Sequence, residues 1–264
     1  MNLIDTHCHL DAAEFCGEQA VLMQAAQLAG VCRLIVPSVS LANFERVRLL
    51  CAAFPVCAPA YGIHPLYTRK AALADLTVLR DYLLLHRPVA LGEIGLDFLV
   101  ANFDRVSQEA FFVAQLKLAR EFSLPVLLHV RRAIDPILKH LRQIRVCGGI
   151  AHAFNGSLVQ AEEFIKLGFK LGFGGAITFT AATRLRRLAA LLPLQSMVLE
   201  TDAPDMPPAF IAKGALNKPE YLPRIAQTLA ELRGVSLQEI ARVTTENSLP
   251  YFNLNHSHAN SPAI

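Results

Sequence analysis

The chain contains no Cys-x-x-Cys spacing, which is the usual sign of a redox pair or a zinc motif. Its six cysteines are scattered through mostly apolar segments. We therefore expect reduced core residues and a cytoplasmic protein. A charge excess of one sign is also missing, since 25 Lys and Arg stand against 22 Asp and Glu, giving a net charge of +3. This balance excludes a nonspecific duplex-DNA wrapper, but it allows a local basic rim.

An apolar run long enough to cross a bilayer is absent as well. One stretch, residues 49–68, has no charged side chain apart from His64, but three prolines and Gly62 divide it. We expect a helix end, a strand and a turn there, and no membrane span. The first ten residues include Asp5 and two histidines instead of a basic start followed by an apolar run. A signal peptide is therefore not expected.

What the chain does contain is enough apolar material for a large core. Hydrophobic residues make up 53% of the 264 residues and charged residues 18%, so disorder is expected only at the C-terminus. The length suits one α/β barrel. Because no linker, internal repeat or low-complexity tract is visible, we predict one domain over residues 1–254, followed by a polar tail over residues 255–264. A monomer is compatible with this organisation.

Short apolar segments alternate with amphipathic segments along the whole chain. The predicted strands are residues 3–9, 33–38, 56–61, 89–93, 126–129, 149–152, 170–174 and 197–200. The predicted helices are residues 18–29, 41–53, 73–85, 107–122, 134–144, 158–167, 181–192, 220–233 and 237–252. Nearly continuous apolar strands separated by helices indicate parallel strands that are buried on both faces. An open doubly wound sheet or a closed barrel would result, and eight units favour a single (β/α)8 TIM barrel.

Two histidines, His7 and His9, lie two residues apart in the first predicted strand. In a strand, residues i and i+2 share a face, so both imidazoles should point one way and Cys8 the other. Such a pair is half of a metal site, although a pair of core or solvated histidines is the ordinary alternative. That alternative is favoured for a second pair, His256 and His258, which lies in the polar tail.

The other predicted strands place ligand-type side chains at the same level. In a TIM barrel, the active site forms at the carboxyl ends of the strands. The residues there are His7, His9, Glu93, His129, His152, Glu200 and Asp202. A single such residue is usually structural, but seven together predict a site. Histidines and carboxylates without cysteine suit zinc, manganese or magnesium. Two cations that share a carboxylate can activate water at neutral pH, and Glu93 is the natural bridge because its strand lies between the histidine groups.

Six short motifs occur in order across residues 3–254: His7-Cys-His9-Leu-Asp11, Gly62-Ile-His64-Pro65, Gly92-Glu93-Ile-Gly95-Leu-Asp97, His129-Val-Arg131, His152-Ala-Phe-Asn-Gly156 and Glu200-Thr-Asp202-Ala-Pro204. With these motifs the sequence resembles the TatD-type metal-dependent hydrolases of the amidohydrolase superfamily. Many of these barrel proteins are deoxyribonucleases. Phe98, where a tyrosine is common, and Ala153-Phe154, in place of a cysteine-containing step, depart from the family pattern. These departures affect substrate contacts and leave the ligands intact.

The resemblance implies roles for individual residues. His7, His9, Glu93 and Asp202 would hold one divalent cation, and Glu93, His129 and His152 a second. Asp202 would also orient or deprotonate the attacking water. His64 would contact phosphate without being a ligand.

Further residues have open roles. Arg131 shares a strand face with His129 and either clamps a phosphate oxygen or forms a salt bridge. Asn217 either faces the site or caps the next helix. Asp11 and Asp97 either orient histidines or make loop hydrogen bonds. Three arginines, Arg184, Arg186 and Arg187, form a solvated helix face or help to bind nucleic acid. Two aromatic residues, Phe210 and Tyr221, pack under a loop or stack on a base.

The leading hypothesis is a metal-dependent phosphodiesterase that acts on DNA ends or single strands. The residues themselves argue only for metal-assisted hydrolysis, and the assignment to DNA comes from the resemblance. One alternative is hydrolysis of an ester or amide, such as an aminoacyl-tRNA ester or a small metabolite. Another is a non-catalytic metal-binding interaction module. A ligand set that leaves coordination positions open argues against the module.

Overall fold

Eight parallel strands form one sheet in the computed structural model, which describes residues 1–251. The strands are β1 (Leu3–Asp5), β2 (Val31–Pro37), β3 (Cys57–Tyr61), β4 (Ala90–Asp97), β5 (Val126–Arg131), β6 (Gly149–Ala151), β7 (Phe169–Phe173) and β8 (Met197–Leu199). Neighbours in sequence are neighbours in the sheet, from β1 to β8. The amide of Thr6 donates to the Leu199 carbonyl at 3.0 Å and joins the last strand to the first. The predicted TIM barrel is therefore confirmed.

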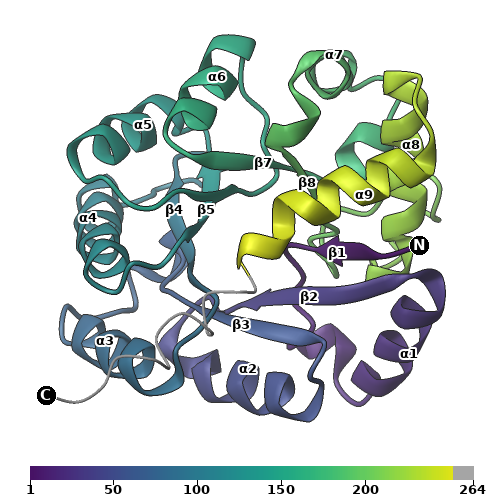
Figure 1. Ribbon diagram of the computed structural model, residues 1–264. Coiled ribbons are helices and arrows are strands. Elements are labelled where there is room, and N and C mark those ends of the chain that lie inside the picture. The colour runs from purple at the N-terminus through teal and green to yellow at the C-terminus, as the bar shows by residue number, and fades with distance from the viewer. Residues whose placement is uncertain (252–264) are drawn as a thin grey trace, which may run out of the picture.

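Helices surround this barrel (Figure 1). Within the described residues they are α1 (Gln19–Ala29), α2 (Leu41–Ala53), α3 (Asp75–His86), α4 (Arg105–Glu121), α5 (Ile134–Gln143), α6 (Leu158–Lys166), α7 (Thr183–Leu191), α8 (Leu222–Arg233) and α9 (Leu237–Ser248). Each begins and ends within a few residues of the predicted helix. Local side chains set two of the starts, because Ser40 and Ser157 form reciprocal capping boxes with Asn43 and Gln160. The strand limits differ more. The first strand ends at Asp5 instead of residue 9, and β4 continues to Asp97.

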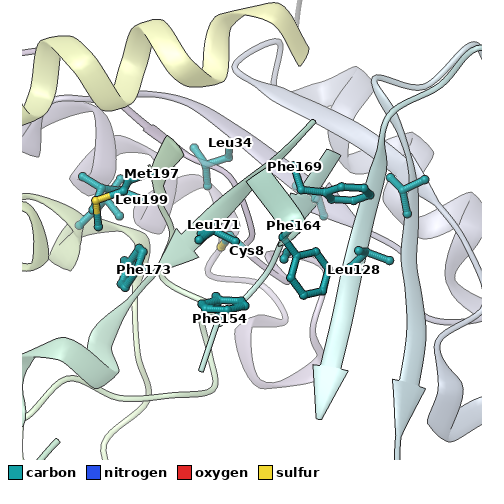
Figure 2. Packing of buried hydrophobic residues seen from close by; sticks show 14 of the residues in the cluster. Cys8, Leu34, Leu128, Phe154, Phe164, Phe169, Leu171, Phe173, Met197 and Leu199 are labelled. Carbon is teal, nitrogen blue, oxygen red and sulfur yellow. The ribbon is translucent and has the colours of Figure 1, made fainter. Parts of the chain in front are cut away.

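Apolar side chains fill two spaces, one between the strands and helices and one inside the barrel. Figure 2 shows part of the outer layer, where Phe164 of α6 packs against Phe169 of β7 with ring centroids 5.9 Å apart. The inner cluster includes Leu127 and Ile150, which alternate with outward-facing residues of the same strands. At the amino ends of the strands, the Tyr251 hydroxyl donates to the Gly149 carbonyl at 2.8 Å and closes the barrel floor.

Several composition-based expectations can be compared with this fold. All six cysteines are unpaired, but Cys16 and Cys147 are exposed, so the expectation of core residues was wrong for these two. The uncharged stretch over residues 49–68 contains the end of α2, then β3 and a 3-10 turn. No helix in the described part of the chain is long and apolar enough to cross a membrane. The domain limit at residue 254, the polar tail and the His256–His258 pair lie outside the described residues.

One irregularity in the sheet determines which way Glu93 points. Between β4 and β5, Leu91 pairs with Val126 and Ile94 with Leu128, so β4 has one residue more than its partner. Such a bulge shifts the alternation of side chains along the strand. Leu91, Ile94 and Leu96 pack in the outer layer, while Glu93 and Asp97 face the barrel mouth. The bulge thus brings Glu93 to the same face as the histidines of the neighbouring strands.

Candidate active site

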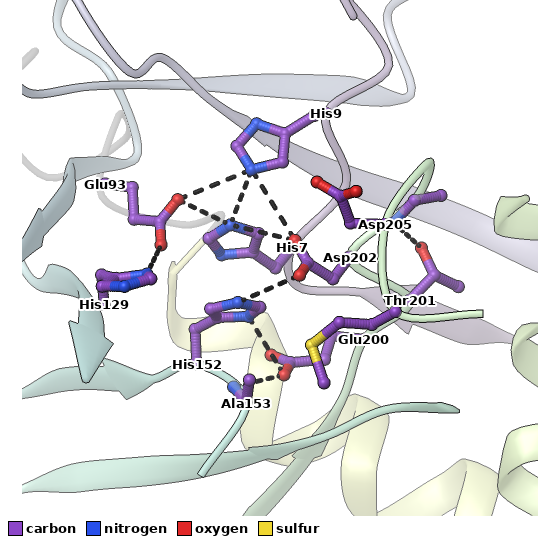
Figure 3. Close-up of polar contacts among 12 residues, drawn as sticks. His7, His9, Glu93, His129, His152, Ala153, Glu200, Thr201, Asp202 and Asp205 are labelled. Carbon is purple, nitrogen blue, oxygen red and sulfur yellow. Dashed lines mark hydrogen bonds and ion pairs between the residues drawn. The ribbon is translucent and has the colours of Figure 1, made fainter. Parts of the chain in front are cut away.

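Histidines and carboxylates gather at the carboxyl ends of the strands (Figure 3). They line a cleft of about 830 Å³ that reaches down to the nearly buried Glu93. All six predicted ligands belong to this cluster: His7, His9, Glu93, His129, His152 and Asp202. Their convergence from five strand ends is the arrangement that a TIM-barrel active site requires.

The His7–His9 pair lies just beyond β1, yet it keeps an extended arrangement. The Cys8 amide donates to Ile35 O, and the His9 amide donates to Ala203 O. These bonds hold the segment between β2 and the loop after β8. As predicted, His7 and His9 face the same side, with their Nε2 atoms 3.3 Å apart, while Cys8 is buried in the apolar core.

Glu93 lies between two groups of histidines. Its Oε2 atom is 3.2 Å from His7 Nε2 and 3.5 Å from His9 Nε2. Its Oε1 atom is 2.9 Å from His129 Nδ1. The two oxygens therefore face different imidazoles, which is the arrangement expected of a bridging carboxylate.

Asp202 completes the side of the cluster that contains the first histidine pair. Its Oδ1 atom lies 3.9 Å from His7 Nε2 and 3.7 Å from His9 Nε2, and its Oδ2 atom lies 3.5 Å from His152 Nε2. The ring of His152 stacks on His7 with centroids 3.7 Å apart. His152 thus lies on the His7 side, whereas the family resemblance groups it with His129.

Two buried acids that were not among the predicted ligands support this cluster. Asp5 accepts bonds from the amides of His7 and Thr201, and from the Thr201 hydroxyl at 2.6 Å. It thereby ties the end of β1 to the segment that carries Asp202. Glu200 accepts from the Ala153 amide at 2.6 Å and lies 3.1 Å from His152 Nδ1. Their positions at strand ends were visible in sequence, but their long-range partners were not.

The electrostatics of the cluster keep its carboxylates ionised. Burial by itself would raise the pKa of Glu93, but the surrounding His7, His64 and His129 hold that pKa well below its usual value. Burial would also raise the pKa of Asp202, but the neighbouring histidines, above all His152, hold it below its usual value. Both groups are therefore negatively charged at neutral pH and are suited to hold cations.

His64 lies against the second oxygen of Glu93. Its Nε2 atom is 3.6 Å from Glu93 Oε1, and burial lowers the pKa of His64 to about 3, so the ring is neutral. The Leu66 amide donates to Nδ1 at 3.2 Å, which places the ring proton on Nε2, toward the cleft. A neutral donor at this position is consistent with a phosphate contact. His64 also belongs to a ligand-like group with Glu93 and His129.

The other predicted substrate residues have different surroundings. Arg131 lines the cleft with 54% of its side chain exposed, and it lies 3.9 Å from Asp97, so both suggested roles fit its position. Asn217 is fully buried, and its amide group donates to the Thr201, Asp205 and Met206 carbonyls. Asn217 therefore does not line the cleft, and its side chain holds the loop after β8 instead of capping the next helix.

The residues with two open interpretations can now be placed. Asp97 contacts His129 Nε2 at 3.0 Å and so orients this histidine with Nδ1 toward Glu93. Asp11 instead accepts bonds from Asn43 and Arg46, without a hydrogen bond to a histidine within residues 1–251. Phe210 packs edge-to-face on Tyr221, under the Arg224 guanidinium, as aromatic packing beneath a loop.

Three arginines of α7 and the two departures from the family pattern have the following surroundings. Arg184 donates to Asn155, and Arg186 donates to the Ile177 carbonyl, while Arg187 is exposed. Phe98 stacks on Phe103 with ring centroids 4.8 Å apart and does not line the cleft. Phe154 is buried in the core.

The donor set fits divalent cations. Three groups of donor atoms lie within 4.8 Å of one another: His7 with Glu93 and His152, His7 with His9 and Asp202, and His64 with Glu93 and His129. Two imidazole nitrogens only 3.3 Å apart beside two carboxylates form a favourable site for a positive charge. Because the set contains no thiolate, zinc, manganese and magnesium all suit it.

Known proteins are similar to this chain in sequence and in fold. The model of the family described as "TatD related DNase" matches residues 4–253. The "Uncharacterized metal-dependent hydrolase YjjV" of Escherichia coli K12 is 41% identical over 255 residues, covering 95% of this chain and 98% of that protein. A metal-dependent hydrolase of Haemophilus influenzae is 38% identical over 264 residues, covering 96% and 100%. The crystal structure of YjjV superimposes with a TM-score of 0.92 at 40% identity, covering 96% and 98% of the two chains.

Removal of one imidazole should empty part of the metal site. We expect His129→Ala to bind one divalent ion fewer than the unsubstituted protein, because it removes the nitrogen nearest to Glu93 Oε1. The measurement is metal content after reconstitution with Mn²⁺ or Zn²⁺. His140→Ala is the matched control, since His140 also lies beside a glutamate, Glu109, but outside the cluster. Unchanged metal content in His129→Ala would contradict the assignment.

Metal affinity should increase with pH. Burial opposes protonation of His9 and His129, but the neighbouring carboxylates overcome it, raising the pKa of His9 to about 9 and that of His129 above its usual value. At pH 7 His9 therefore carries a proton in the ion-free protein and must release it to bind metal, and the raised pKa of His129 acts in the same direction. The apparent affinity for Mn²⁺ should therefore rise between pH 6 and 8.5, by up to about tenfold per pH unit for each proton released. Calorimetric titrations that give a constant affinity would refute this.

Proposed function

Because the chain belongs to the TatD family of metal-dependent hydrolases, we propose that it hydrolyses phosphodiester bonds of DNA at strand ends or in single strands. The observation that carries the hydrolytic part is the position of Glu93, whose two carboxylate oxygens face separate imidazoles inside an open cleft. The description of the matching family supports DNA as the substrate. A purely structural metal site leaves no room for a substrate, whereas this cleft has room for one.

The groups of donor atoms support a site for two cations. His7, His9 and Asp202 would hold one cation, His129 would contribute to the site of the second, and Glu93 would contribute to both. In this arrangement His152 adds a ligand beside His7 and Asp202. When bound, such ions polarise the phosphodiester and make water a better nucleophile.

Asp202 is the group best placed to take the proton from the attacking water. Its pKa is lowered by the neighbouring histidines, so the carboxylate is available as an acceptor. It is 13% exposed, in contrast to 3% for Glu93, so water reaches it more readily from the cleft. The proton transfer leaves a hydroxide to attack phosphorus, while the P–O bond to the leaving group breaks.

Two side chains are placed to hold the scissile phosphate. His64 presents a neutral N–H toward the cleft, and Arg131 reaches it from the end of β5 with its guanidinium largely exposed. The neutral N–H of His64 and the guanidinium of Arg131 can bind a phosphate oxygen without displacing the metal ions from their ligands.

We expect Asp202→Asn to lose far more turnover than metal. A neutral amide oxygen still coordinates a cation but is a poor proton acceptor, and general base catalysis contributes about 10²–10⁴-fold. Turnover of a single-stranded oligonucleotide and metal content should be measured on the same preparation. Asp205→Asn is the matched control, because Asp205 lines the same cleft but forms no ion pair with a histidine among the described residues. Near-normal turnover of Asp202→Asn would exclude the base role.

The protein should prefer DNA ends and bind DNA with a weak dependence on salt. The net charge of +3 and a site inside the barrel mouth suggest contact with only a few phosphates. Each neutralised phosphate steepens the slope of log affinity against log salt by about 0.7 for single strands. Linear DNA should be cut faster than covalently closed circles, and Asp202→Asn should give a slope of roughly −2. Efficient cutting of closed circles, or a slope near that of eight contacts, would indicate an endonuclease with a broad basic surface.

A further inference from the structure

An apolar pocket adjoins the catalytic cleft. It has a volume of about 380 Å³ and is lined by Ala176, Phe179, Ala182, Met206 and Pro207. Met206 also lines the cleft itself, so the two spaces share a wall. The pocket thus lies next to the cleft but differs from it in chemistry, since none of its lining side chains carries a charge.

The pocket comes from the one strand end that contributes nothing to the cleft. Among the described residues, no side chain between β7 and β8 lines the cleft. After β7, the chain forms a 3-10 turn, η3 (Gly175–Thr178), and continues through Phe179 to α7. The opposite wall follows Asp202 in the loop after β8. A ligand that reaches from the cations into this pocket therefore passes from polar to apolar surroundings within one short span.

Hydrogen bonds hold the two walls together. The Ala209 amide donates to the Thr178 hydroxyl at 2.7 Å. Gly175 packs so closely on the facing loop that a Cβ atom there would lie 3.1 Å from Pro208 N. Asn217 donates to the Met206 carbonyl at 3.3 Å and to Thr201 in the segment that carries Asp202. The pocket is therefore preformed and fixed relative to the proposed base.

Two of its side chains expose considerable apolar surface. Phe179 is 45% exposed and Met206 36%. An aromatic ring and a thioether favour a flat, polarisable partner. Because the lining contains no cation, it does not suit a second phosphate. A nucleotide combines the two chemistries that are present here, an anionic phosphate for the cation cluster and a flat ring for the apolar pocket.

We propose that this pocket binds the nucleobase of a nucleotide adjoining the scissile phosphate, with Phe179 and Met206 as its main contacts. This inference rests on the proposed function. A base reaches the pocket only when it is unpaired and unstacked. The pocket therefore provides a reason for a preference for single strands or frayed ends, and it does so without reading sequence, since every base has a π-face.

The test compares dithymidine phosphodiester with its two analogues in which one or the other nucleotide is abasic. The unsubstituted enzyme should lose roughly tenfold in kcat/KM on one of the analogues, as expected for one base stacked on an aromatic ring. Phe179→Ala should lose roughly tenfold on dithymidine but nothing further on that analogue. Phe179→Tyr, which keeps the ring, should retain the preference. Phe103→Ala is the control, because Phe103 has similar exposure, at 37%, but lies in the loop after β4, outside both spaces.

The outcomes separate the two proposals. An unsubstituted, metal-loaded enzyme that cleaves no phosphodiester overturns the proposed function and this inference with it. An active enzyme that does not discriminate against either abasic analogue overturns the inference alone. So does a Phe179→Ala variant that keeps the full preference for the base, or one that loses equally on all three substrates, since equal loss means a structural effect. Preferential turnover of an aromatic carboxylic ester over dithymidine would assign the pocket to an acyl group instead.

Discussion

A buried negative charge on Glu93 is the constraint on which the rest of the site depends. An ionised carboxylate with so little exposure is stable only if positive charge or hydrogen-bond donors surround it. Four imidazoles from three other strand ends surround this carboxylate, two near Oε2 and two near Oε1. Removing one partner from such a buried group typically costs about 3–5 kcal/mol, so the cluster is not a tolerant surface site. Divalent cations would neutralise the same charge, with the imidazoles then acting as ligands.

The supporting structure follows from this constraint. An extra residue in β4 directs Glu93 inward, and Asp97, at the end of the same strand, orients His129. On the opposite side, Asp5 joins the histidine segment to Thr201, and Asn217 holds the loop that follows Asp202. Gly172 also contributes, because any side chain there would collide with the Glu200 carboxylate beside His152. Precise placement of ligands by such secondary contacts is what a metal-dependent active site requires.

The sequence was sufficient to predict the barrel and the membership of the cluster. Strand ends are recognisable locally, and a parallel barrel brings all of them to one face, so His7, His9, His129, His152 and Asp202 needed no knowledge of tertiary contacts. The direction of the Glu93 side chain, in contrast, does not follow from the local sequence. Strict alternation from Ala90 would have turned it away from the mouth, and a bulge depends on the partner strand as well as on β4. Partners distant in the chain were equally inaccessible: Asp5 with Thr201, and Phe179 with Met206. In isolation, Phe179 is an ordinary apolar loop residue.

We propose that Glu93 joins two groups of ligands into one metal centre. Anomalous diffraction from crystals equilibrated with Mn²⁺ would locate each ion without reference to activity. We expect two peaks, one next to each carboxylate oxygen of Glu93, with His7 and His9 beside one of them and His129 beside the other. Peaks that are absent from the cluster, or ions that make no contact with Glu93, would contradict it.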